Sequence, residues 1–150
     1  MHRPKAQTAA LLASPEDTEQ QFYEALQSAD LDRLMEVWAD EDEISCVHPG
    51  GQRIVGVSAI RSAFEALFAK GAVAVAPERV RRLQTQDTAI HQVLERVNVT
   101  GPQGTPQSAW VIATNVYMKT AMGWRLVVHH ASPGTASDVQ DVLDEPTTLH

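Results

Sequence analysis

The chain has 150 residues, of which 43% are hydrophobic and 21% charged, and its formal net charge is -7. This size fits one domain with one hydrophobic core, and the acidic balance excludes the basic surface that nucleic acid requires. No apolar run approaches the roughly 20 residues that cross a bilayer, the N-terminal apolar stretch is too short for a signal peptide, and the single cysteine permits no internal disulfide. We therefore expect a cytoplasmic protein with no nucleic-acid or membrane partner.

Three helical patterns open the chain. Ser14–Asp17 places a hydroxyl at an N-cap, proline at the first helical position and acids in the first turn, which predicts a helix that begins there. Asp30 is a second N-cap candidate, and apolar residues at helical spacing follow it as far as Trp38. A third helix is expected from Ser58 to a stop at Gly71.

After Gly71 the pattern changes to β-branched stretches separated by turn residues, which is typical of an antiparallel sheet. We expect strands at about 73–85, 88–99, 107–120 and 123–132, and an earlier short strand at 44–48. Helices followed by a meander predict an α+β fold with a pocket between the two layers. Residues 1–13 and 134–150 are expected to be flexible tails, the second acidic, around one domain at 14–133.

Four segments carry a resemblance to a known family: Leu31–Asp40, Val47–Gly51, Ile54–Gly56 and Gly123–Pro133. Together they resemble the SnoaL-like branch of the nuclear transport factor 2-like superfamily. The resemblance implies a cystatin-like cone, in which three N-terminal helices pack in the concave face of a highly curved, mixed but mainly antiparallel sheet. It also implies a homodimer that pairs through the outer sheet face. It does not fix the chemistry, because the superfamily contains isomerases, cyclases, hydrolases, dioxygenase subunits and assembly domains.

Histidines are the candidate catalytic groups, because imidazole exchanges a proton near neutral pH. His48, His129 and His130 lie at the ends of two predicted strands, where a cone of this kind opens. Strict alternation on the last strand puts His130 on the inner face with Leu126, and His129 at the surface or an interface, unless a bulge changes the phase. We take His130 and His48 as the catalytic pair. The alternative is that these rings only fasten strand ends.

Other residues are candidates for ligand contact. Trp38 is expected to wall the cavity, with Trp110 on the more apolar face of its strand, packed on the helices. Asn115 and Tyr117 share the other face, which is expected to pair with a second subunit, and they are also the candidate hydrogen-bonding groups. Residues 107–132 contain no Asp or Glu, so a steroid-isomerase arrangement of carboxylates cannot be transferred. Alternation leaves open whether Glu95 or Arg96 is exposed.

Two functions remain possible on this sequence. One is a homodimeric module that holds a small organic molecule in an apolar pocket containing His129 and other histidines. The other is an enzyme that acts on such a molecule by histidine-assisted proton transfer, of isomerase, cyclase or hydrolase type. No cofactor is predicted, and no ligand spacing such as His-x-x-x-His predicts a metal site.

Overall fold

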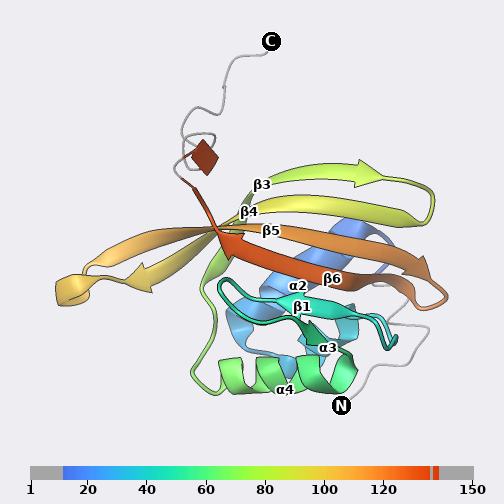
Figure 1. Cartoon of the computed structure of the whole chain (residues 1–150), viewed down its shortest axis with the longest axis horizontal. Helices are drawn as coiled ribbons and strands as arrows, with labels where there is room; N and C mark the ends of the chain where they lie inside the picture. The colour runs from blue at the N-terminus through green and yellow to red at the C-terminus, as the bar shows by residue number, and fades with distance from the viewer. Residues whose placement is uncertain (1–11, 136, 139–150) are drawn as a thin grey trace, which may run out of the picture.

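The computed structural model describes residues 12–135 and 137–138. The α-helices lie beneath one face of a curved sheet (Figure 1). The helices are α2 (Pro15–Ser28), α3 (Leu31–Val37) and α4 (Val57–Phe68). The strands are β1 (Ser45–Val47), β2 (Ile54–Val55), β3 (Val75–Gln84), β4 (Thr88–Thr100), β5 (Pro106–Thr120) and β6 (Gly123–Pro133), with a short 3-10 helix η1 (Pro102–Gly104) between β4 and β5. The predicted α+β cone is confirmed.

The helix boundaries follow from local capping. The Ser14 side chain accepts a hydrogen bond from the Asp17 amide at 3.1 Å, and Asp30 accepts one from the Arg33 amide at 3.1 Å. Each bond satisfies one of the amides that the first turn of a helix leaves unpaired. Between the two caps, Ala29 has a left-handed backbone with φ of 53°, which ends α2 and turns the chain into α3. Both predicted starts are confirmed, whereas α4 begins one residue earlier than Ser58.

The sheet is mixed, with the order β2-β1-β6-β5-β4-β3. All neighbouring strands are antiparallel except β1 and β6, which run parallel. The parallel pair is what brings His48, just past β1, beside the C-terminal half of β6. No helix in the described part of the chain is long and apolar enough to cross a membrane.

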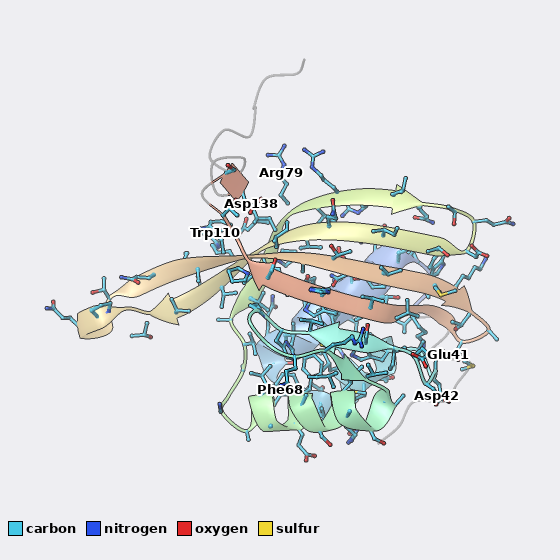
Figure 2. The ribbon with its side chains drawn as sticks, viewed as in Figure 1. Glu41, Asp42, Phe68, Arg79, Trp110 and Asp138 are labelled. Carbon is cyan, nitrogen blue, oxygen red and sulfur yellow. The ribbon has the colours of Figure 1, made fainter. Side chains whose placement is uncertain are left out.

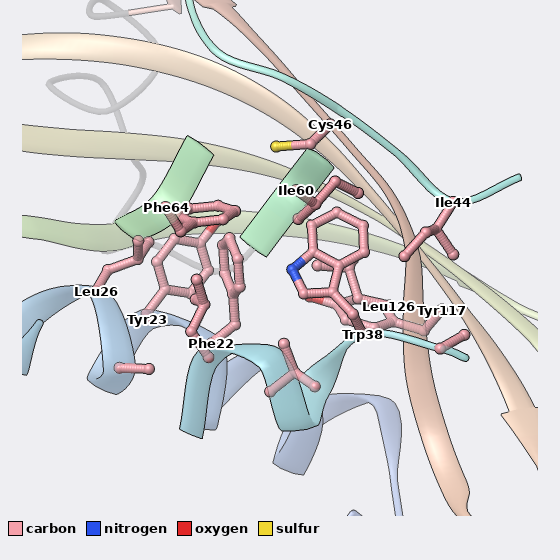
Figure 3. Packing of buried hydrophobic residues seen from close by; sticks show 14 of the residues in the cluster. Phe22, Tyr23, Leu26, Trp38, Ile44, Cys46, Ile60, Phe64, Tyr117 and Leu126 are labelled. Carbon is pink, nitrogen blue, oxygen red and sulfur yellow. The ribbon is translucent and has the colours of Figure 1, made fainter. Parts of the chain in front are cut away.

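The core lies between the helices and the concave face of the sheet (Figure 3). Phe22 of α2 is at its centre, with its ring edge-on to Tyr23 at 5.1 Å and to Phe64 of α4 at 6.5 Å between centroids. Trp38 is 2% exposed and forms an isolated bridge with Leu126 of β6. These aromatic rings join all three helices to the sheet, and so they set the distance between the two layers.

A β-bulge in β6 decides which histidine faces inward. Val116 pairs with Val128, but the next residue of β5, Tyr117, pairs with Leu126, so Val127 is an extra residue on β6. Such a bulge reverses the alternation of side chains beyond it. Trp124 and Leu126 are buried before the bulge, as alternation predicts, but beyond it His129 is buried and His130 is exposed. The prediction that His130 faces the cavity was therefore wrong.

The face assignment of β5 was also wrong. Ala113, Asn115 and Tyr117 are buried against the helices, whereas Met118 is 44% exposed on the outer face. Trp110 lies on that outer face as well, with its backbone accepting a hydrogen bond from Gly134. The prediction failed because it assigned the more apolar side to the core, while here the buried side carries polar groups whose partners come from α2.

Candidate functional site

A cavity of about 310 Å³ lies between α2, α4 and the concave face of the sheet. Most of its lining is aliphatic or aromatic, and the three titratable groups that reach it are His48, Glu95 and His129. The apolar residues that line it are Phe22, Leu26, Pro49, Phe64, Leu67, Val73, Val75, Val97, Ala109, Val111 and Ala131. A concave, largely apolar space with a few convergent polar groups is the usual form of a small-molecule site.

His129 is held as a neutral imidazole. Its Nδ1 lies 2.6 Å from Oδ1 of Asn115, and because that oxygen only accepts, Nδ1 carries the proton and donates it. Burial, together with the smaller effects of the neighbouring His48 and His130, lowers the pKa of His129 to about 3. No residue of the described chain is hydrogen-bonded to Nε2 of His129. This nitrogen therefore keeps a lone pair for a molecule in the cavity.

A chain of hydrogen bonds connects His129 to Glu95. Asn115 Nδ2 donates to the Tyr23 hydroxyl at 3.1 Å, and that hydroxyl donates to Glu95 Oε2 at 2.6 Å. Burial raises the pKa of Tyr23 well above its usual value, so the phenol stays protonated and keeps donating. The direction of every bond in the chain is thereby fixed from His129 to Glu95.

Glu95 closes this chain at the other side of the cavity. Burial raises the pKa of its carboxyl to about 7, with the Tyr23 hydrogen bond lowering it and the charge of Glu19 raising it. A carboxyl with such a pKa is present in both forms near neutral pH. The cavity therefore contains a neutral base, His129, and a group able to act as an acid, Glu95.

A second polar cluster lies behind the first. Glu19 of α2 accepts hydrogen bonds from the Tyr117 hydroxyl at 2.9 Å and from Nδ1 of His91 at 2.8 Å. The other ring nitrogen of His91 lies 3.4 Å from Glu16 Oε2. The Tyr117 hydroxyl is thus directed to Glu19, and Tyr117 is not among the residues that line the cavity.

His48 lies beside His129 at the rim of the cavity. Its ring is 6.4 Å from that of His129 and 5.2 Å from that of Phe64 between centroids. It is half-buried, and burial lowers its pKa. Cys46 Sγ lies 3.9 Å from His48 Nε2, but burial raises the pKa of the thiol to about 12, which leaves it a weak nucleophile.

The predicted site residues thus divide into three groups. His48 and His129 reach the cavity, with Asn115 bonded to His129 from behind. Trp38 and Tyr117 are buried in the core without lining the cavity. His130 and Trp110 lie on the outer face.

Sequence reasoning missed the roles of Tyr23, Glu19 and His91, and left Glu95 unresolved. The signals were a Glu and a Tyr four residues apart on one side of α2, and the alternation of Glu95 with Val93 and Val97 on β4. Neither signal names its partner, because the partners are about 70 to 100 residues away along the chain.

A family model described as the SnoaL-like domain matches residues 16–136. The chain belongs to the SnoaL-like family. The match begins at the first turn of α2 and ends just beyond β6, so it includes every helix and strand that forms the cavity of this SnoaL-like domain.

Solved structures resemble the SnoaL-like domain closely. A candidate calcium/calmodulin-dependent protein kinase type II association domain from Thiobacillus denitrificans is 34% identical, with 83% of this chain and 98% of that chain covered and a TM-score of 0.74. A candidate dehydratase of the NTF2-like family from Streptomyces avermitilis is 30% identical, with 79% and 93% covered and a TM-score of 0.70. An uncharacterised protein with a cystatin-like fold from Caulobacter vibrioides shares 18% identity, which shows the fold alone, with 93% and 99% covered and a TM-score of 0.69. No curated protein matches the sequence.

No group of three or more His, Cys, Asp or Glu is arranged to hold a metal ion among residues 12–135 and 137–138. His48 and His129 are the two imidazoles at the cavity, and the third candidate, His130, points to the other side of the sheet. The Nε2 lone pair of His129 and the carboxyl of Glu95, with its raised pKa, are suited to hydrogen bonding and proton transfer.

Proposed function

We propose that this SnoaL-like domain binds a small, largely apolar organic molecule in the cone cavity, with Nε2 of His129 as its polar contact. The observation that supports this is the state of His129, a neutral ring whose Nδ1 proton is donated to Asn115. A lone pair in an apolar cavity accepts a hydrogen bond that water does not weaken. The ligand should therefore carry a hydroxyl, an N–H or an acidic C–H on a hydrophobic frame.

The lining also limits the ligand. A volume of about 310 Å³ is near the lower end of the roughly 300 to 1,000 Å³ typical of ligand sites, which favours a molecule with one or two rings. Of the described residues that line the cavity, none is a Lys or an Arg, whereas Glu95 is among them. An anionic ligand would lie beside a buried carboxyl without a counter-charge, so the ligand should be neutral.

Two probes of nearly equal size test this proposal. Phenol can donate to Nε2 of His129 and toluene cannot, so calorimetric titration should show phenol binding roughly tenfold more tightly. This preference should disappear in His129→Phe and persist in His130→Phe, the matched change on the outer face. Equal binding of the two probes to the native protein, or an unchanged preference in His129→Phe, would contradict the proposal. Native mass spectrometry of the purified protein would identify a retained ligand and the subunit count.

Enzyme activity is the second candidate function, and the position of Glu95 favours it. With an acid and a base at one cavity, Nε2 of His129 can take a proton from carbon next to a carbonyl while protonated Glu95 gives its proton to the carbonyl oxygen. The C–H electron pair becomes the new C=C bond of an enol. If that enol is conjugated with a second C=C bond, His129 can deliver its proton to the far carbon of the conjugated system while Glu95 takes its proton back from the enol oxygen, which moves the double bond and completes an isomerisation. The candidate dehydratase at 30% identity also suits proton-transfer chemistry.

Proton exchange in D₂O tests that second function without knowledge of the natural substrate. Phenylacetone is a neutral ketone of suitable size, and its α-protons should exchange faster with the native protein, as followed by NMR. The acceleration should be lost in His129→Gln and kept in His130→Gln. Loss in both variants, or in neither, would exclude the role given to His129.

We further propose that the domain forms a homodimer through the outer face of the sheet. A row of apolar side chains crosses this face at one level of the strands: Leu83, Ile90, Val116 and Val128, with Met118 next to them. Pairing with a second copy would remove this row from water. The candidate association domain at 34% identity supports self-association. A cytoplasmic location remains part of the proposal.

A further inference from the structure

Two adjoining hollows lie on the outer face of the sheet; the first is away from the apolar row, and the second reaches that row at Val128. One, of about 280 Å³, is lined by Arg79, Arg81, Gln92, Leu94, Ile112 and Asp138. The other shares Gln92 and Ile112 with it and continues across β5 to His130 and Ser132 of β6. Together they form a groove that runs across β3, β4, β5 and β6, with two guanidinium groups at the β3 end.

This end of the outer face is already partly covered. Leu94 is 4% exposed, whereas Ile90, four residues earlier on the same face of β4, is 37% exposed. The chain that follows β6 returns over this region, because the Gly134 amide donates to the Trp110 carbonyl at 2.8 Å and Asp138 lines the first hollow. Figure 2 shows Arg79, Trp110 and Asp138 near one another where β6 ends.

The sequence beyond Asp138 complements this groove. Residues 139–150 contain the acids Asp141, Asp144 and Glu145, no Lys or Arg, and the apolar residues Val139, Val142, Leu143 and Leu149. The groove offers positive charge from Arg79 and Arg81 and apolar contact from Leu94 and Ile112. Four strands spaced about 4.8 Å apart are crossed by roughly six extended residues, so the segment is long enough to follow the groove.

We propose that residues 139–150 dock in cis along this groove, with their acidic side chains against Arg79 and Arg81 and their apolar side chains against Leu94 and Ile112. The C-terminal segment then covers one end of the outer face and leaves the row around Ile90, Val116 and Met118 for a second copy. Because the groove faces solvent, attraction between the acids of the segment and the two arginines should mainly fix the direction and position of the segment. It should add little to the affinity of the segment for the groove.

Backbone NMR relaxation of the full chain tests the docking residue by residue. Order parameters of amides between 139 and 145 should approach the value of about 0.85 of rigid backbone in the native protein. They should fall below about 0.6 in the double variant Arg79→Glu with Arg81→Glu. The matched control, Lys70→Glu with Arg53→Glu, makes the same change of net charge on exposed residues outside the groove and should leave them high.

Two further measurements and one substitute variant decide the interpretation. Reversing the charges of the segment as well, with Asp141→Arg and Asp144→Arg, should restore order to the Arg79/Arg81 double variant. Sodium chloride at 1 M, where charges are screened beyond about 3 Å, should lower the native order parameters. If Arg79→Glu with Arg81→Glu unfolds the domain, Arg79→Gln with Arg81→Gln replaces it.

Three outcomes would overturn the proposal. Low order parameters in the native protein would show that the segment does not dock. High values in the Arg79/Arg81 variant would place it elsewhere. Values that rise with protein concentration would show that the segment docks on a second copy and not in cis.

Discussion

The two faces of the sheet show the reverse of the usual pattern of burial, because polar side chains are buried on one face and apolar side chains are exposed on the other. The concave face carries His91, Glu95, Asn115, Tyr117 and His129, and all five are buried. The convex face carries apolar side chains that remain exposed, with Ile90 at 37% and Met118 at 44%. On this sheet, a polar side chain is buried where a helix packed against it supplies a hydrogen-bond partner. Hydropathy alone therefore does not predict which face is buried.

The partners of the concave face come from one helix. Glu19 and Tyr23 stand one turn apart on α2, so a single docked helix supplies the hydroxyl and carboxylate that Asn115, Tyr117 and His91 require. Buried polar groups are tolerated when each has a hydrogen-bond partner. Within residues 12–135 and 137–138, no such layer covers most of the convex face, and its apolar row is exposed or half-buried.

The largest expected difference between the faces is in packing. Phe22→Ala removes a fully buried ring that touches the rings of Tyr23, Phe64 and His129, and should lower the free energy of unfolding by about 3 to 5 kcal/mol. Leu83→Ala, on the convex face at 67% exposure, should change it by no more than about 0.5 kcal/mol. Urea denaturation measures both, and similar losses would mean that the convex face is covered as fully as the core.

Opposed pH dependences should follow from the two ends of the hydrogen-bond chain. Glu95 has a folded-state pKa of about 7, raised from 4.5, so the native state holds more protons than the unfolded state and its contribution is lost as pH rises through that window. His129 has a folded-state pKa of about 3, lowered from 6.5, so its contribution is lost as pH falls from 6.5 towards 3. Between pH 4.5 and 6.5 the two effects act against each other.

Glu95→Gln should therefore unmask the effect of His129. Relative to the native protein, the unfolding free energy of this variant should rise with pH between 5 and 6 more steeply by up to about 1.4 kcal/mol per pH unit. His129→Phe should change the slope in the opposite direction. Denaturation curves at several pH values measure the slopes, and identical slopes for the three proteins would mean that neither group has the assigned pKa.

Loss of the Tyr23 hydroxyl, the middle group of the hydrogen-bond chain between His129 and Glu95, should lower the unfolding free energy by less than Phe22→Ala does. Tyr23→Phe leaves Glu95 Oε2 and Asn115 Nδ2 without their shared partner, and should cost about 2 kcal/mol of unfolding free energy. It should also raise the pKa of Glu95 further, because the Tyr23 hydrogen bond lowers it. Carbon NMR of the carboxyl follows the titration. Thr114→Val, on the convex side of the same strand, is the control and should leave that pKa unchanged.

Substitutions in the apolar row should have the smallest effect on the unfolding free energy. Their effect should be on self-association. Met118→Lys on the convex face should alter the unfolding free energy of the monomer by about 0.5 kcal/mol or less and should dissociate the proposed homodimer. Val57→Lys, similarly exposed at the start of α4, should leave it intact. Analytical ultracentrifugation compares the two, and a native monomer, or a dimer that survives Met118→Lys, would exclude this face as the interface.

Local signals in the sequence predicted the elements well. The caps at Ser14 and Asp30 are short-range contacts, and the turns between strands depend on a few neighbouring residues. The five predicted strands lie within about two residues of their observed bounds, whereas the short strand β2 was not predicted. The segments near His48 and His129 also identified the family, so the cone was predictable.

The faces of β5 and β6 were not predictable in the same way. One extra residue, Val127, exchanges His129 for His130 at the cavity, and no residue type in the segment marks its position. On β5, Asn115 and Tyr117 are polar enough for either face until Tyr23 and Glu19 are placed beside them. The predicted flexible tails at 1–13 and 134–150 lie largely outside the described residues.

By itself, the sequence determined that this chain is an α+β cone and where its helices and longer strands begin and end, because capping, periodicity and turns are local. Only the tertiary structure decided that His129 is the histidine at the cavity, that Asn115 fixes its tautomer, and that Glu95 faces it with a raised pKa. Those properties depend on pairing across strands and on burial under α2, and both join residues that are far apart in the chain.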